Sequence, residues 1–163
     1  MLGAEFPHAT AGNIKPTSEA THDYNCIAWA LHVNDRFIWP DEDEQFAWPP
    51  MVAREETLAA FTELFTLSGF ERCINDQPEP GYEKVALYGR DGAILHAARL
   101  LPSGKWASKL GVSIDIEHSC PVAISGGEYG WVVAVFRRPA KGRPALPPLH
   151  PVPAPPPLLI GIK

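Results

Sequence analysis

Residues 84–99 read KVALYGRDGAILHAAR, and the predicted fold is built outward from this stretch. Its two ends, 84–88 and 93–99, are apolar runs of a length suited to β-strands. The pair Asp91-Gly92 between them is typical of a tight hairpin turn. The stretch therefore predicts two antiparallel strands joined by a short turn.

The strand pattern continues toward the C-terminus. A turn at Pro102-Ser103-Gly104 leads to a predicted strand over 105–109, and a further strand is predicted over 113–116. Residues 130–137, GWVVAVFR, form the most apolar run of this part. We expect this last strand to be central or half-buried in the sheet.

The sequence before residue 84 has a helical character. A helix is expected to begin at a cap, Thr21 or Asp23, and to stop at about Asn34-Asp35. A second helix is predicted over 54–67, and a short strand over 70–74. Helices followed by a run of strands predict an α+β fold, with N-terminal helices packed on an antiparallel β-sheet.

Proline marks the predicted domain boundary. Residues 139–157 hold nine of the 18 prolines of the chain, so they can neither continue a helix nor pair within a sheet. We expect one domain over 1–138 and an extended proline-rich tail over 139–163. The tail is a candidate ligand for the aromatic groove of a protein partner, or else a linker or a strap that covers the domain.

Charge limits the classes of partner. The net charge is −5, but residues 137–163 hold five basic residues and no acidic one. The rest of the chain therefore has nine basic residues against 19 acidic ones, a net of −10. Because phosphate binding needs a basic face, nucleic acid is not an expected partner. Apolar runs are too short for a membrane span, so no membrane association is expected.

Cysteine usage indicates the compartment. The three cysteines, Cys26, Cys73 and Cys120, are widely spaced and form no C-x-x-C pair, so neither a disulfide framework nor a cysteine zinc site is expected. No signal peptide is recognised at the N-terminus, and a cytoplasmic location is expected, with secretion as an effector left open. We expect no metal, since His22 and His32 find no third ligand, and no organic cofactor.

Cys26 is the candidate nucleophile. It lies in the segment His22-Asp23-Tyr24-Asn25-Cys26, within the first turns of the first predicted helix. The positive end of a helix dipole and its unpaired N–H groups favour a thiolate there. The alternative is a buried free cysteine that acts as a small apolar residue of the core.

His96 is the candidate general base for Cys26, with a satisfied structural histidine as the alternative. Alternation along the strand places His96 on the face of Ile94 and Ala98. If Pro102 and Ser103 form a tight turn, His96 is expected opposite Lys109, with Ser108 beside it. Candidates to orient or support the base are Ser108, Lys109, Asp115, Glu117, His118 and Lys84.

A cysteine early in the first helix, followed by strands that read KVALY, Gly92 and His96-Ala97, resembles the papain-like NlpC/P60 group of cysteine peptidases and amidases. The resemblance covers about residues 24–98. It implies a papain-like core and a hydrolase or acyl transferase that acts on a peptide or amide bond, as in a bacterial effector or cell-wall enzyme. In that group a catalytic histidine usually opens the first of these strands, where this chain has Lys84.

Lysine at position 84 is normally protonated and therefore a poor base. Two interpretations follow. Either His96 serves as the base of a rearranged dyad with Cys26, and the substrate is a peptide, a protein or another amide. Or the domain is a non-catalytic relative, a binding or adaptor module that uses an aromatic groove and the tail. The residues expected to line the groove are Tyr24, Asn25, Trp29 and Trp106.

Overall fold

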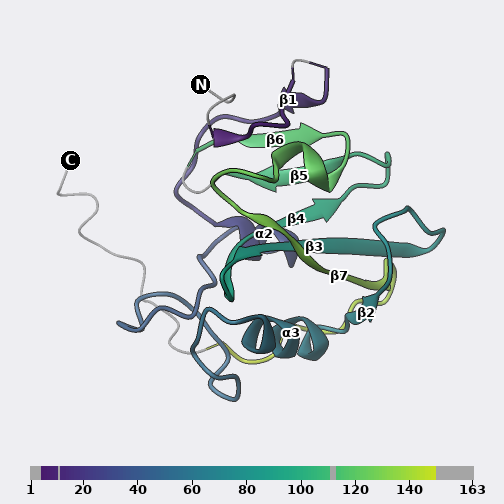
Figure 1. The fold of residues 1–163 in the computed structure, drawn as a ribbon. Helices are drawn as coiled ribbons and strands as arrows, with labels where there is room; N and C mark the ends of the chain where they lie inside the picture. Colours follow the sequence, from purple (N-terminus) through teal and green to yellow (C-terminus); the bar gives the residue numbers. More distant parts are fainter. Residues whose placement is uncertain (1–4, 11, 111–112, 150–163) are drawn as a thin grey trace.

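A computed structural model describes residues 5–10, 12–110 and 113–149 (Figure 1). The fold is mostly β, with one open seven-stranded sheet in the order β1-β6-β5-β4-β3-β7-β2, and every neighbouring pair is antiparallel. The strands are β1 (Ile14–Pro16), β2 (Glu71–Cys73), β3 (Tyr82–Arg90), β4 (Ala93–Leu100), β5 (Trp106–Lys109), β6 (Asp115–His118) and β7 (Trp131–Pro139).

The predicted hairpin is confirmed as β3 and β4. Asp91 and Gly92 both adopt positive φ, 52° and 85°, as a tight turn between right-twisted strands requires. The register shifts between Tyr88 and Gly89, where a β-bulge interrupts the pairing. Because of the bulge, the side chains of Ile94 and His96 lie on opposite faces of the sheet. Ile94 packs in the core on one side, whereas His96 contacts Tyr88 on the other. The expectation that His96 shares a face with Ile94 is therefore wrong.

The turn after β4 is one residue from the predicted register. Arg99 pairs with Ala107 and Leu100 with Trp106, so the numbers of two paired residues sum to 206. The predicted pairing of His96 with Lys109 corresponds to a sum of 205. Since successive side chains of a strand alternate between faces, this shift decides which residue of β5 accompanies His96. It is Ser108, and Lys109 points to the opposite face.

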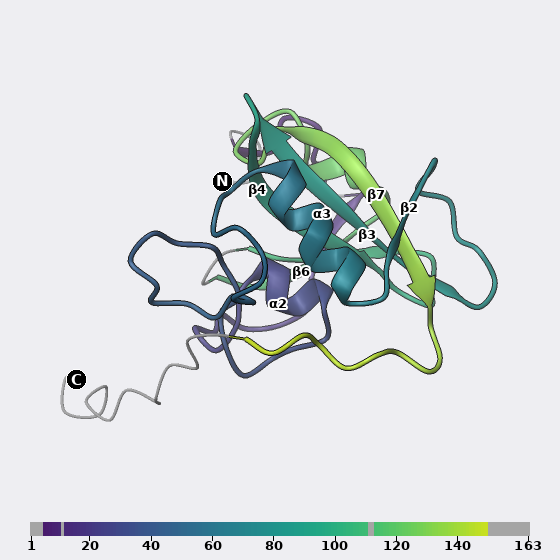
Figure 2. The ribbon, with the colours of Figure 1, turned by 90° about the horizontal axis from the view of Figure 1, so that it is seen from below.

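Two short helices lie on the same side of the sheet (Figure 2). Helix α2 (Cys26–Ala30) begins later than predicted, because Asn25 is its cap and accepts a hydrogen bond from the backbone N–H of Ala28 at 3.2 Å. Helix α3 (Leu58–Leu67) begins in the same way after the cap Thr57. The structure thus has less helix than the predicted α+β fold, because its two α-helices are short and most of its regular structure is strand.

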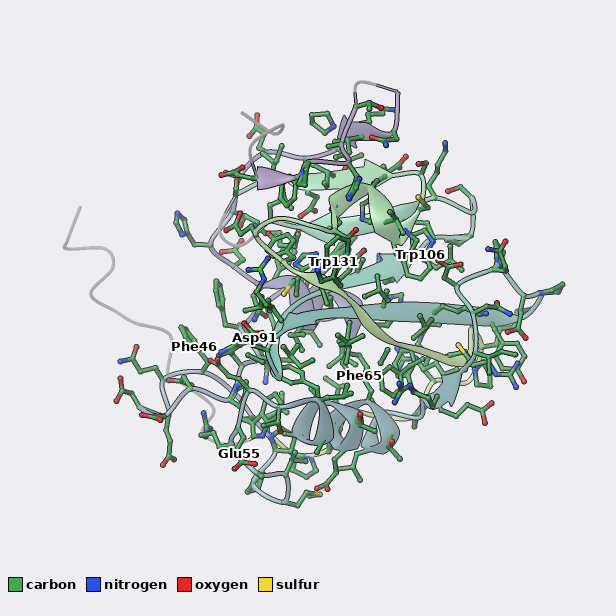
Figure 3. The ribbon with its side chains drawn as sticks, viewed as in Figure 1. Phe46, Glu55, Phe65, Asp91, Trp106 and Trp131 are labelled. Carbon is green, nitrogen blue, oxygen red and sulfur yellow. The ribbon has the colours of Figure 1, made fainter. Side chains whose placement is uncertain are left out.

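The sheet separates two apolar cores. The first lies between the sheet and the helices and contains Phe61 and Phe65 of α3. Phe65 is labelled in Figure 3. The second lies on the other face, around Tyr88, Trp106 and Ile116, and is covered by Phe6 and by the segment 119–130 with its short 3-10 helix (Pro121–Ile124). Side chains on the two faces of one strand therefore belong to different environments.

Residues 140–149, named the strap here, run from the end of β7 back toward α2 (Figure 2). Leu146 and Leu149 pack against the core beneath the helices, and the Arg143 guanidinium bonds the Glu83 carboxylate at 3.0 Å. This part of the predicted tail is thus in contact with the domain. The rest of the predicted tail, 150–163, lies outside the described residues.

Candidate functional site

Cys26 opens α2, as expected, but its thiol belongs to the core. The residue is 7% exposed and packs in the apolar cluster beneath the helices. Burial raises the pKa of the thiol to about 11, although backbone hydrogen bonds, the first of them with Ala97, act in the opposite direction. A thiolate is therefore disfavoured at neutral pH, and Cys26 has the environment of a structural cysteine.

His96 lies on the opposite face of the sheet, in a chain of hydrogen bonds. Its Nε2 is 2.9 Å from Ser108 Oγ, which is 2.8 Å from His118 Nε2, while His118 Nδ1 is 2.9 Å from the carbonyl oxygen of Cys120. The His96 ring also stacks on Tyr129, with centroids 3.9 Å apart. Both histidines are 1% exposed, so the network is closed to solvent.

The carbonyl of Cys120 fixes the direction of the chain of hydrogen bonds. A carbonyl only accepts, so His118 Nδ1 carries a proton and, in the neutral ring, Nε2 accepts from the Ser108 hydroxyl. Ser108 then accepts from His96 Nε2–H. Burial lowers the pKa of His118 to about 4, and burial together with the charge of His118 lowers that of His96 well below its usual value. Neutral rings suit this network.

The sheet thus keeps the two predicted catalytic residues apart. Cys26 packs with Ala97, and Ala97 and His96 are consecutive residues of β4 that point to opposite faces. Lys84 shares the face of His96, is fully buried and forms an ion pair with Glu79 at 2.9 Å. The structure does not bring Cys26 and His96 together as a dyad.

The four predicted groove residues are also divided between the faces. Trp106 is buried in the second core, whereas Tyr24, Asn25 and Trp29 lie at or before α2. Asn25 is occupied, because its side chain accepts from Ile38 N–H and donates to the Ile38 carbonyl besides capping α2. Tyr24 and Trp29 stack at 5.9 Å.

A line of stacked groups extends from this aromatic pair. Lys109 Nζ lies 5.5 Å from the centre of the Tyr24 ring, and the Arg99 guanidinium lies 3.9 Å from that of Trp29. The Tyr24 hydroxyl donates to Asp115 at 2.9 Å, and burial and this bond raise the pKa of Tyr24 to about 12. The predicted supporting residues Lys109 and Asp115 therefore meet on the side of the sheet that carries α2.

Lys109 also makes structural contacts with the backbone. Lys109 Nζ donates to the carbonyls of Thr21 and Ser113, which ties the segment before α2 to β5. Glu117, the last predicted supporting residue, is half-buried on β6, paired with Lys15 of β1. In the described part of the chain, two buried polar atoms lack a hydrogen-bond partner, Asp115 Oδ1 and Trp29 Nε1.

A cleft beside the strap is not indicated by any pattern in the sequence. This hollow, named the strap cleft here, has a volume of about 570 Å³ and lies where β4 ends and β3 begins. It draws on four segments far apart in the chain. Its lining comprises His32, Pro78, Glu79, Pro80, Gly81, Tyr82, Glu83, Arg99, Leu100, Leu101, Pro102, Ala140 and Arg143.

Glu83 anchors the charged side of the strap cleft. Its carboxylate bonds Arg138 at 2.5 Å, His32 at 2.9 Å and Arg143 at 3.0 Å. Burial alone would raise the pKa of Glu83, but the hydrogen bonds from His32, Arg143 and Arg138 outweigh it and lower the pKa to about 2. The cross-strand pairing of Glu83 with Arg138 is the one part of this cluster that a correct strand register would have indicated.

Arg99 is the cation of the strap cleft that has no carboxylate. Its guanidinium donates to the Trp29 carbonyl at 2.9 Å and stacks on the Trp29 ring. Within residues 5–10, 12–110 and 113–149, no acidic side chain forms an ion pair with it. Burial lowers the pKa of Arg99, although the charges of Glu83 and Asp115 act in the opposite direction.

Within the described residues, no group of three or more His, Cys, Asp or Glu side chains is placed to hold a metal ion. The helices of the described chain are also too short or too polar to cross a bilayer.

Fold and site together define the class of this protein, a mostly β domain with one open antiparallel sheet, two short helices on one face and a cleft beside its strap. The chain belongs to the family described as Domain of unknown function (DUF7689), whose model matches residues 15–137. Comparison with curated proteins and with solved structures gives no match. The family match ends before the strap.

Proposed function

We propose that this protein is a non-catalytic binding domain and that its ligand occupies the strap cleft. The observation that carries the proposal is Arg99, a partly buried guanidinium in the cleft wall with no carboxylate partner in the described residues. Ligand sites are typically concave, mostly apolar and equipped with a few convergent polar groups. The strap cleft has this composition, and its volume of about 570 Å³ falls within the usual range of small-molecule sites.

The position of Cys26 favours binding over cysteine catalysis. A thiol nucleophile needs access to substrate and a base on its own side, whereas Cys26 is buried and His96 faces the second core. On this proposal, the resemblance to the NlpC/P60 group marks a scaffold without the catalytic pair of that group. This is one of the two interpretations that Lys84 at the usual histidine position leaves open.

Thiol accessibility tests the non-catalytic half of the proposal. The native chain is treated with iodoacetamide at pH 7, and adducts are located by mass spectrometry. We expect exposed Cys120 to react first and Cys26 to react only on unfolding, because its thiol is buried and protonated. His96→Ala is compared in parallel. Rapid alkylation of Cys26 that this variant slows would reveal a thiolate–imidazolium pair and overturn the proposal.

Chemical-shift mapping tests the cleft half. A small-fragment library, neutral and acidic, is screened against the ¹⁵N-labelled chain by following backbone amide shifts. We expect the largest shifts at the cleft walls, at Tyr82, Arg99 and Leu101. Leu101→Trp, which fills the cleft, should abolish them, while Met51→Trp, an exposed position outside the cleft lining, should not. Binding that clusters elsewhere and survives Leu101→Trp contradicts the proposal.

A further inference from the structure

We infer that the ligand of the strap cleft carries a carboxylate on an apolar body, and that Arg99 binds this carboxylate. The inference rests on the proposed function and adds the chemical class of the ligand. It follows from the unused N–H donors of Arg99, from the charges that surround its guanidinium and from the apolar walls of the cleft.

Arg99 is held in place while donors remain available. A guanidinium has five N–H donors, and the described contacts use one of them, to the Trp29 carbonyl at 2.9 Å. The stack on Trp29, at 3.9 Å, fixes the plane of the group. A fixed planar fork suits the two oxygens of a carboxylate, which can be bound bidentately with little loss of side-chain freedom.

The acidic groups of the cleft are already neutralised. Glu83 is bonded by Arg138 and Arg143, and Glu79 is bonded by Lys84 at 2.9 Å and by Arg137 at 2.5 Å. Both carboxylates thus hydrogen-bond to other cations, and neither forms an ion pair with Arg99. Because Glu83 alone serves two arginines, the cleft holds more cations than carboxylates, and a ligand carboxylate would compensate part of this positive charge.

The rest of the lining defines the body of the ligand. The lining includes Leu100, Leu101 and Pro102, at and just after the end of β4, together with Pro80 and Tyr82 before and at the start of β3. These walls offer apolar and aromatic surface and few hydrogen-bonding groups, so burial of an aliphatic or aromatic group there is favourable. An aryl or alkyl monocarboxylate combines both requirements.

Matched acids and amides test this inference on the full chain. The probes are indole-3-acetate, phenylacetate and hexanoate, each beside its carboxamide, and affinities are measured by titration calorimetry and amide shifts. We expect each acid to bind at least about tenfold tighter than its amide, since a hydrogen-bonded charge contributes more than a neutral group. Arg99→Gln should remove this preference, and Arg99→Lys should restore part of it by returning the charge without the fork.

Matched controls separate the possible failures. Arg90→Gln changes an exposed arginine outside the strap cleft and should keep the preference for acids, and urea unfolding verifies that each variant is folded. If acids and amides bind the cleft equally well and Leu101→Trp blocks both, the cleft remains the ligand site and the carboxylate inference is overturned. If no probe and no library fragment binds the cleft, the proposed function fails with it.

Discussion

Ser108 and Lys109 are consecutive residues of β5 whose side chains connect to opposite sides of the sheet. Ser108 Oγ bonds His96 at 2.9 Å and His118 at 2.8 Å within the second core. Lys109 Nζ donates to the Thr21 carbonyl at 3.0 Å, beside α2. One peptide unit thus joins the buried histidine network to the segment that carries Cys26, without bringing the imidazole near the thiol.

The buried histidines predict a loss of stability in mild acid. Folding lowers the pKa of His118 to about 4 and also lowers the pKa of His96. Below about pH 6.5 the unfolded chain therefore binds more protons than the folded chain. The stabilisation is complete above about pH 6.5 and decreases as the pH falls toward 4, by up to about 1.4 kcal/mol per pH unit for each ring. Urea unfolding at pH 7.5 and pH 5.0 measures this.

A control for this pH dependence is His22, an exposed histidine. His22→Gln should leave the difference between the two pH values unchanged, whereas His118→Gln should reduce it. Equal stability of the native sequence at pH 7.5 and pH 5.0 would contradict the assignment of neutral, buried rings.

Ser108→Ala tests the network directly. The change removes the hydroxyl between the two imidazoles and leaves His96 Nε2 and His118 Nε2 without their partner in a buried site. Each unsatisfied buried group costs about 1–3 kcal/mol, so we expect a loss of roughly 2 kcal/mol or more in the free energy of unfolding. Ser119→Ala, at an exposed neighbour of the network, should change it by less than about 0.5 kcal/mol.

Glu83→Gln tests the charge cluster of the strap cleft. The amide cannot neutralise the buried Arg138, so we expect a loss on the order of 3 kcal/mol in unfolding free energy at pH 7. Glu71→Gln is the matched control, because the Glu71 side chain is 62% exposed and its pair with Arg137 should contribute less than about 1 kcal/mol. Similar losses for both variants would show that Glu83 is not the anchor.

The strap can be tested by limited proteolysis. Trypsin can cleave after Lys141, whereas the Arg143-Pro144 bond resists it because proline follows the arginine. Cleavage needs the backbone to leave the domain surface. Leu146→Ala with Leu149→Ala removes packing against the core and should increase the cleavage rate several-fold. Ile74→Ala, at a residue 98% exposed, should have no effect. An unchanged rate in the double variant would indicate that packing by these leucines does not hold the strap.

Much of the sheet could be predicted from local patterns, because β3, β4 and β7 are apolar runs delimited by turn residues. Strand β1 was missed, since its three residues have no pattern of their own and form a strand only through β6. The face of His96 depended on a bulge and on a one-residue register, neither of which is written in composition or alternation.

The candidate site was harder to predict than the fold. The location of Cys26 at the start of α2 followed from a helix pattern and a nearby cap, but the side of the sheet that α2 covers depends on long-range packing. The strap cleft depends entirely on long-range packing. His32, Glu83, Arg99 and Arg143 come from four separate segments, and no local signal connects them.

The order of the strands has a consequence for synthesis of the chain. Strand β2, at residues 71–73, pairs with β7, which is complete only at residue 139, and β1 pairs with β6, about 100 residues further along. During translation the β3–β4 hairpin can form early, whereas both edges of the sheet wait for late partners. Apolar segments beneath α3 thus stay open to chaperones until β7 emerges from the ribosome.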